Sequence, residues 1–349
     1  MNKLSTFTLT LLSTIMLVYI LIVGKALIIP FIVALLIWQF INTIANGIKK
    51  APGIGEYCPN WLCMVLSIIF LLMLAYGIVS IVSDNVAAVI NAAPRYQDRF
   101  MELLDSISAS AHIKPLTFSD KSNWVQQLDL RSFLLNVSSV FTSITGNAVL
   151  IFLYVIFLFI EQKVLLNKTQ AFFARESSRD LTTHMVHYVL KDTQVYLGIK
   201  TLTSLLAAVS SWLIMWKVGL DFSEFWALLI FFLNFIPSIG AITATIFPAV
   251  LAAIQFSALP PFLEVTLGIS AIQMMIGSFI EPRLMGYSLN LSPLIILMAL
   301  VIWGTLWGVV GMFLSVPITV TMMIVFSNFE KTRGIAVLLS RDGTLKKRS

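Results

Sequence analysis

The chain has 349 residues, of which 58% are hydrophobic and only 11% are charged. Soluble globular proteins carry about 25% charged residues, so this chain has too few polar side chains to cover a folded core in water. The composition therefore excludes a soluble enzyme or binding module and indicates that a lipid bilayer is the main solvent. The net charge of +6 reflects membrane topology, because Lys and Arg gather on the cytoplasmic side of membrane proteins, and we expect no nucleic-acid partner.

Apolar runs long enough to cross a bilayer recur along the whole chain. A spanning helix needs about 20 apolar residues, and the strand-like alternation of a membrane β-barrel is missing. Helices are required because every backbone polar group must be satisfied within the segment. We therefore predict an all-α, polytopic integral membrane protein with about eight membrane segments. These segments are 6–23, 26–45, 62–83, 140–160, 197–216, 224–255, 261–280 and 293–327.

The distribution of cations predicts the orientation. Lys and Arg are concentrated near the N-terminus, between residues 161 and 200, and after Ser327. Because these stretches lie on one side if each of the first four runs crosses once, both termini are predicted to be cytoplasmic. A multi-pass membrane protein is expected, with membrane lipid as its immediate partner. The Lys346–Arg348 tail suits anionic headgroups.

Two polar segments separate the apolar runs. From Pro94 the apolar residues follow helical spacing, with Pro94 suited to a first helical turn. The stretch 161–196 is polar but also periodic, as in interfacial helices. The predicted organisation is a three-span unit (1–83), an extracytoplasmic amphipathic helical cap (84–136), a fourth span (137–160), cytoplasmic amphipathic helices (161–196), a C-terminal transport unit with broken helices (197–327) and a basic cytoplasmic tail (328–349).

Two of the apolar runs are too long for one simple crossing. As a single helix, 224–256 would measure about 48 Å, and 293–327 is similarly long. Pro237 and Gly240 interrupt the first run, and Gly304, Gly308 and Gly311 interrupt the second. One arrangement is an inverted pair of re-entrant hairpins that flank 261–280, and the other is two long, kinked single spans. Arg283 distinguishes them, since it lies inside for hairpins and outside otherwise.

Broken membrane helices indicate where a transporter binds its substrate, because unwound backbone exposes carbonyl groups. A packing kink at Pro237 is the alternative interpretation. Glu281 is a candidate proton or cation relay, unless it only forms a local ion pair with Arg283. Gln273 either faces a pathway or hydrogen-bonds a neighbouring helix. The candidate pathway residues are Asn234, Pro237, Ser238, Gly240, Gln273, Glu281, Arg283, Gly304, Gly308 and Gly311.

Sequence motifs for other chemistry are missing. The chain has no Walker A sequence, no G-x-S-x-G elbow and no H-E-x-x-H pair. Cys58 and Cys63 have a spacing that is not usual for zinc or redox sites. We therefore expect no catalytic residues, no metal and no cofactor.

The C-terminal motifs resemble those of the autoinducer-2 exporter (AI-2E) family of permeases over about 110 residues, and the rest of the chain is similar in layout. The resemblance is carried by Asn234–Gly240, Pro248–Leu251, Gln273, Pro282–Gly286, Leu289–Leu294, Trp303–Gly311 and Leu314–Pro317.

The resemblance implies a transporter of roughly eight membrane segments, in a family that exports the small polyol autoinducer-2 or exchanges sodium for protons. The leading hypothesis is secondary export of a small polar solute by alternating access, with H⁺ or Na⁺ as candidate coupling ions and Glu281 as the coupling carboxylate. The alternatives are a sodium/proton antiporter and a non-transporting membrane scaffold. Glycine-rich spans permit a homo-oligomer without requiring one.

Overall fold

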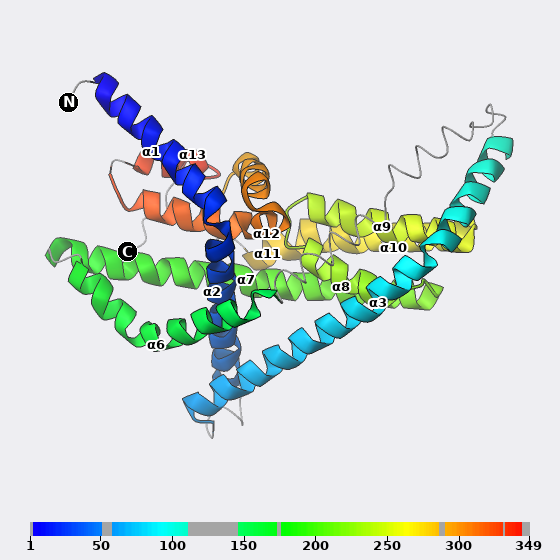
Figure 1. Cartoon of the computed structure of the whole chain (residues 1–349), viewed down its shortest axis with the longest axis horizontal. Coiled ribbons are helices and arrows are strands. Elements are labelled where there is room, and N and C mark those ends of the chain that lie inside the picture. The colour runs from blue at the N-terminus through cyan, green and yellow to red at the C-terminus, as the bar shows by residue number, and fades with distance from the viewer. Residues whose placement is uncertain are drawn as a thin grey trace. The chain divides into compact units, whose positions relative to one another are not determined.

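The structure, a computed structural model, describes residues 3–50, 58–110, 146–172, 176–285, 290–330 and 332–343. Over these residues it consists of helices joined by turns and short irregular segments, with a single isolated β-bridge between Leu291 and Ser340. The helices are α1 (Lys3–Val23), α2 (Lys25–Lys50), α3 (Asn60–Ser110), α6 (Ala148–Phe172), α7 (Glu176–Val218), α8 (Ser223–Leu233), α9 (Ile239–Phe256), α10 (Leu259–Met275), the π-helix η1 (Ile276–Ile280), α11 (Glu281–Met285), α12 (Pro293–Ser327) and α13 (Arg333–Leu339) (Figure 1).

The predicted all-α, polytopic membrane class is confirmed. Among the described residues, six helices are long and apolar enough to cross a bilayer, and three shorter apolar helices accompany them. Large apolar side chains lie exposed along these helices, such as Leu12, Tyr76 and Val149. In water this exposure would be unfavourable, so these side chains are suited to contact with lipid.

Helix α3 runs across the boundary that was expected between the third span and a separate cap. It continues without a break through residue 94 to Ser110, so Pro94 does not begin a helix. Its apolar part, Asn60–Asn85, is long enough to cross the bilayer, and the remaining turns extend the same helix beyond that part. Residues 111–136 of the predicted cap lie outside the described residues.

The chain forms two compact units. Unit 1 comprises Met1–Ile68, Ile144–Tyr196 and Tyr287–Ser349, and unit 2 comprises Ile69–Ser143 and Leu197–Gly286. This division differs from the predicted segments, because the expected C-terminal transport unit 197–327 falls partly in each. The two overlong apolar runs therefore belong to different units.

In unit 1, α2 packs against α6 and also contacts α1 and α12, while α13 packs on α12. Phe31 of α2 meets Tyr154 of α6 edge to face, with ring centroids 5.5 Å apart. Trp307 of α12 donates its indole N–H to the carbonyl oxygen of Leu21 in α1, at 3.0 Å. These contacts assemble helices from both ends of the sequence.

In unit 2, α8 and α9 pack against each other and α9 packs against α10. The core is apolar, and its largest fully buried members include Trp226, Phe225, Met215 and Ile269. Trp226 of α8 stacks on Phe247 of α9, with ring centroids 6.2 Å apart. This packing positions the polar groups described below.

Candidate functional site

The run 224–256 folds as a helical hairpin. Helix α8 ends at Leu233, and Pro237, which lacks an N–H, lies in the turn before α9 starts at Ile239. A methyl group at Gly240 would overlap the carbonyl oxygen of Leu233, so the two arms approach too closely for a larger residue. Ser238 adopts a positive φ of 59°, a strained conformation that is typical of functional sites. The predicted break at Pro237–Gly240 is therefore the tip of the hairpin.

Side chains close the other end of this hairpin. Gln255 at the end of α9 donates to the carbonyl oxygen of Gly219 at 2.9 Å and accepts the backbone N–H of Asp221 at 2.8 Å. Tyr96 of α3 donates to Asp221 Oδ2 at 2.6 Å, and Arg99 donates to the carbonyl oxygen of Gln255 at 2.7 Å. Burial, together with the hydrogen bond to Asp221, raises the pKa of the Tyr96 phenol. The start of the hairpin, near Gly219, and its finish, near Gln255, therefore lie side by side.

Helices α7 and α10 run antiparallel, and three contacts fix their register. Lys217 pairs with Glu264 at one end and Lys200 pairs with Glu281 at the other, both at 2.7 Å. Between them, a methyl group at Gly268 would lie 2.8 Å from Ile214 Cδ1. The two ion pairs are about 26 Å apart along the helices, close to the thickness of the hydrocarbon layer.

This register decides between the two arrangements weighed for 224–256. Lys217 near the end of α7 pairs with Glu264 near the start of α10. The segment between them therefore begins and finishes at the same end of the α7–α10 pair. Arg283, two residues after Glu281, therefore lies at the opposite end, where Lys200 pairs with Glu281, as the hairpin arrangement predicts. The single-span alternative would have placed Glu264 beside Lys200.

The partner of Glu281 is Lys200 of α7 and not Arg283, whose side chain is exposed. The local Glu281–Arg283 pair considered from the sequence is therefore corrected. Side-chain exposure is 7% for Lys200 and 21% for Glu281, whereas the pair at the other end, Lys217–Glu264, is exposed by 74% and 47%. Removing one partner of a buried ion pair strongly destabilises the folded protein, because the other charge stays buried and uncompensated.

The π-helix η1 sets the direction of Glu281. The backbone N–H of Glu281 donates to the carbonyl oxygen of Ile276, five residues earlier. In a regular α-helix, Glu281 would lie about 80° around the axis from Gln273. The π-turn accommodates one extra residue, which reduces the angle between Gln273 and Glu281 to about 20°. Both side chains therefore lie on the buried face of α10.

Several polar groups inside unit 2 have no hydrogen-bond partner. Among the described residues these include Asn234 Nδ2 at the hairpin tip, Gln273 Nε2 on α10, and the hydroxyls of Ser204 and Ser211 on α7. Buried polar groups in proteins are nearly always paired, by protein or by ordered water. Unpaired donors on the hairpin and on both helices of the antiparallel pair are therefore available for water or a polar solute.

The remaining predicted residues lie as follows. Pro237 is half-buried and Ser238 is exposed at the hairpin tip in unit 2. Gly304, Gly308 and Gly311 belong to unit 1, where Gly308 has non-helical backbone angles (φ 65°, ψ −143°). A methyl group at Gly311 would overlap the carbonyl oxygen of Trp303, so α12 folds sharply at Gly308. The predicted second break is thus present, and its inverted relation to the first stays a prediction.

Sequence reasoning counted Lys200 as one of many cytoplasmic cations and missed its pairing with Glu281. A signal existed, because Lys200 shares one face of α7 with Thr203, Ser204 and Ala207 at helical spacing, all of them buried. The π-turn had no recognisable signal. Gln255 was missed because a glutamine at a helix end has many possible roles.

Comparison with known proteins identifies the family. The model of the AI-2E family transporters matches residues 11–331 of the chain. The chain belongs to the AI-2E transporter family. It is therefore a multi-pass membrane transporter by family, a class of permeases rather than enzymes.

Individual relatives align over most of both chains. A Haemophilus influenzae protein provisionally named as a transport protein is 30% identical over 92% of this chain and 93% of its own length. The AI-2 transport protein TqsA of Escherichia coli K12 is 27% identical over 90% of this chain and 89% of its own. A Borreliella burgdorferi protein, also provisionally named as a transport protein, is 30% identical over 73% of this chain and 70% of its own.

Proposed function

We propose that this AI-2E family member is a secondary transporter that exports a small polar solute of the autoinducer-2 kind across the bacterial inner membrane by alternating access. Both termini lie in the cytoplasm in this proposal. The name of the relative TqsA supports the solute class. The names of the relatives favour solute transport over sodium/proton antiport, so antiport is not carried further.

The observation that carries the proposal is the set of unpaired buried donors on the hairpin and on helices α7 and α10 of unit 2. Asn234 and Gln273 hold amide N–H groups with no protein partner. A hydroxylated solute can accept these hydrogen bonds, and satisfying a buried unpaired group is favourable. Broken helices near the bilayer midplane are where transporters place such sites.

The Lys200–Glu281 pair is the proposed coupling element. A proton or a Na⁺ ion that binds Glu281 neutralises the carboxylate and so releases Lys200 from its ion pair. This release changes the packing of α7 against α10, which can favour one of two arrangements of the transporter. Solute, ion and lipid are the expected partners, and a homo-oligomer stays an open prediction.

Reconstituted vesicles test the function directly. Vesicles loaded with labelled autoinducer-2 are expected to release the label faster with the wild-type protein than without it. Glu281→Gln keeps the size of the side chain but removes the charge, so release should fall at least tenfold. Release equal to that of protein-free vesicles would refute the proposed solute, and wild-type release by Glu281→Gln would refute the coupling role.

A further inference from the structure

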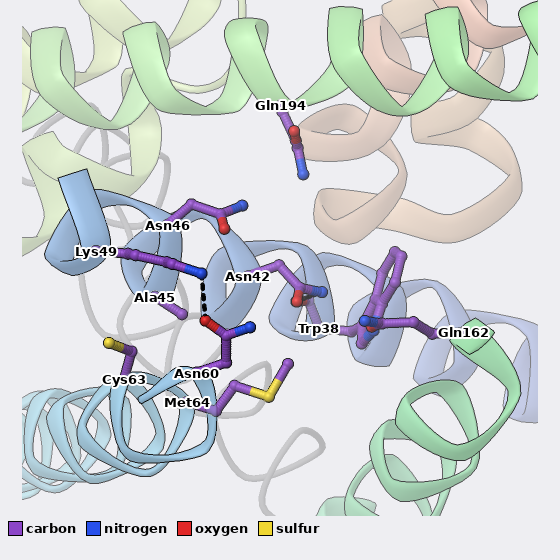
Figure 2. Close-up of a pocket in the computed structure, with 10 residues that line it drawn as sticks. All are labelled: Trp38, Asn42, Ala45, Asn46, Lys49, Asn60, Cys63, Met64, Gln162 and Gln194. Atoms are coloured by element: carbon purple, nitrogen blue, oxygen red, sulfur yellow. Dashed lines mark hydrogen bonds between the residues drawn. The ribbon is translucent and has the colours of Figure 1, made fainter. Parts of the chain in front are cut away.

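A polar pocket lies within unit 1, and none of the residues that line it belongs to the site described above. Its volume is about 340 Å³, within the range of about 300–1,000 Å³ that is usual for small-molecule sites. Figure 2 shows lining side chains from α2, α3, α6 and α7 around one space, with Gln194 pointing from α7 toward the others. The lining residues are Trp38, Asn42, Ala45, Asn46, Lys49, Asn60, Cys63, Met64, Gln162 and Gln194.

The chemistry of the lining is that of neutral amides beside an aromatic ring. Five of the lining residues are Asn or Gln, none is acidic, and Lys49 is the one cation, which donates to Asn60. The indole N–H of Trp38 donates to Gln162 Oε1 at 2.9 Å, and this bond holds the ring and the amide together. Amides both donate and accept hydrogen bonds, as hydroxyl groups do, and an indole face packs on C–H groups.

We propose that this pocket binds a small neutral polyhydroxylated solute on the cytoplasmic side of the membrane. The proposal rests on the function proposed above, because it names the solute class and the place of entry. The side follows from the end of α2, where Lys49 and Lys50 are adjacent, since cations concentrate in cytoplasmic loops. The lining disfavours a cation, because it offers no carboxylate and already contains the ammonium group of Lys49.

Two asparagines provide a matched pair of variants for the test. Asn42 Nδ2 donates to the carbonyl oxygen of Trp38 at 3.0 Å, and Asn85 Nδ2 donates to that of Ile81 at 2.8 Å, in each case four residues earlier in the same helix. Asn42 lines the pocket, and Asn85 does not. Substitution by leucine removes the same local bond from both helices, so a difference between Asn42→Leu and Asn85→Leu reports the pocket.

The experiment measures binding of labelled autoinducer-2 and of labelled ribose to the full-length protein in detergent micelles by equilibrium dialysis. We expect saturable binding of at least one probe that weakens about tenfold in Asn42→Leu and in Gln162→Met, as expected for a lost hydrogen bond to a ligand, and wild-type binding in Asn85→Leu. Equal binding by all three variants would overturn the proposal. Displacement of the label by glycerol 3-phosphate but not by unlabelled ribose would also overturn it, since it would show an anion or headgroup site.

The same proteins in vesicles separate this proposal from the proposed function. Binding that depends on Asn42, without release of either solute from vesicles, would support the pocket and refute export of these solutes. Release that is unchanged in Asn42→Leu and Gln162→Met but lost in Glu281→Gln would support export and refute the pocket. Thermal unfolding of each variant in micelles checks that the comparison is made between folded proteins.

Discussion

Two lysine–glutamate pairs with the same 2.7 Å separation mark the two ends of the α7–α10 pair, and they differ in their surroundings. Lys200–Glu281 is largely buried, and Lys217–Glu264 is exposed. An exposed pair contributes little to stability, because solvent screens it. Removing one partner of a buried pair costs about 3–5 kcal/mol. The chain thus contains its own control for the effect of burial on an ion pair.

Replacement of each lysine by methionine compares the two pairs. We expect Lys200→Met to lower the melting temperature in detergent micelles clearly, because it leaves the Glu281 carboxylate buried without its cation. Lys217→Met should leave the melting temperature within a few degrees of the wild type. Equal effects of the two substitutions would contradict the buried role of Lys200.

The hydrogen bond from Tyr96 to Asp221 predicts a dependence on alkaline pH. The raised pKa keeps Tyr96 protonated in the folded protein after the unfolded chain has ionised. Its stabilising contribution is therefore complete below the ordinary tyrosine pKa of about 10 and is lost as the pH rises above that value. Thermal unfolding between pH 8 and pH 11 should show a steeper loss of stability for the wild type than for Tyr96→Phe. Parallel curves for the two proteins would argue against the bond.

At the scale of elements, the hairpin formed by 224–256 is held by a close backbone contact at its tip and by side-chain hydrogen bonds at its base. The tip needs glycine at position 240, because the backbone of Leu233 occupies the space of a side chain. The base needs Gln255, whose single amide meets both Gly219 and Asp221. The two ends of the hairpin therefore depend on different chemistry, backbone space at one and hydrogen bonds at the other.

Gly240→Ala tests the tip against a matched glycine. The new methyl group can be accommodated only if the backbone of α8 or α9 moves, so we expect lower thermal stability and loss of transport. Gly77→Ala in α3 has no atom within 4 Å of its new methyl group and replaces a poor helix former by a good one, so it should be neutral or stabilising. A fully active and stable Gly240→Ala protein would contradict the packing of the tip.

The side of Arg283 tests the hairpin arrangement. Single cysteines at Pro260 and Arg283, in a protein whose Cys58 and Cys63 are replaced by alanine, are expected to react with a membrane-impermeant maleimide from opposite sides of the membrane. Arg283→Cys should be protected in intact cells and react in inverted vesicles, while Pro260→Cys should show the reverse. Reaction of Arg283→Cys in intact cells would require a single span.

Much of this architecture was accessible from the sequence, for identifiable reasons. Apolar run length located the described helices that can span a bilayer, although it joined α8 and α9 in one run. Pro237 with Gly240 located the hairpin tip, since both features act locally along the chain. The Lys200–Glu281 pair was not accessible, because it depends on the register of two helices far apart in sequence and on the π-turn before Glu281. The same holds for the amide pocket, which combines side chains of four helices.

At the scale of the whole molecule, the two units divide the polar features between them. Unit 2 contains the hairpin, the unpaired donors and the buried ion pair, and unit 1 contains the amide pocket and the break at Gly308. A transporter that works by alternating access needs at least two arrangements that a solute or an ion can favour.

The most direct test of the account is solute release from vesicles by charge-reversal variants of the buried pair. Lys200→Glu and Glu281→Lys each place two like charges together, so each should lose most of the release of labelled autoinducer-2. The double variant restores opposite charges at the same contact and should recover a substantial part of the wild-type rate. Wild-type release by either single variant, or a folded double variant no more active than the singles, would contradict the claim that this pair controls transport.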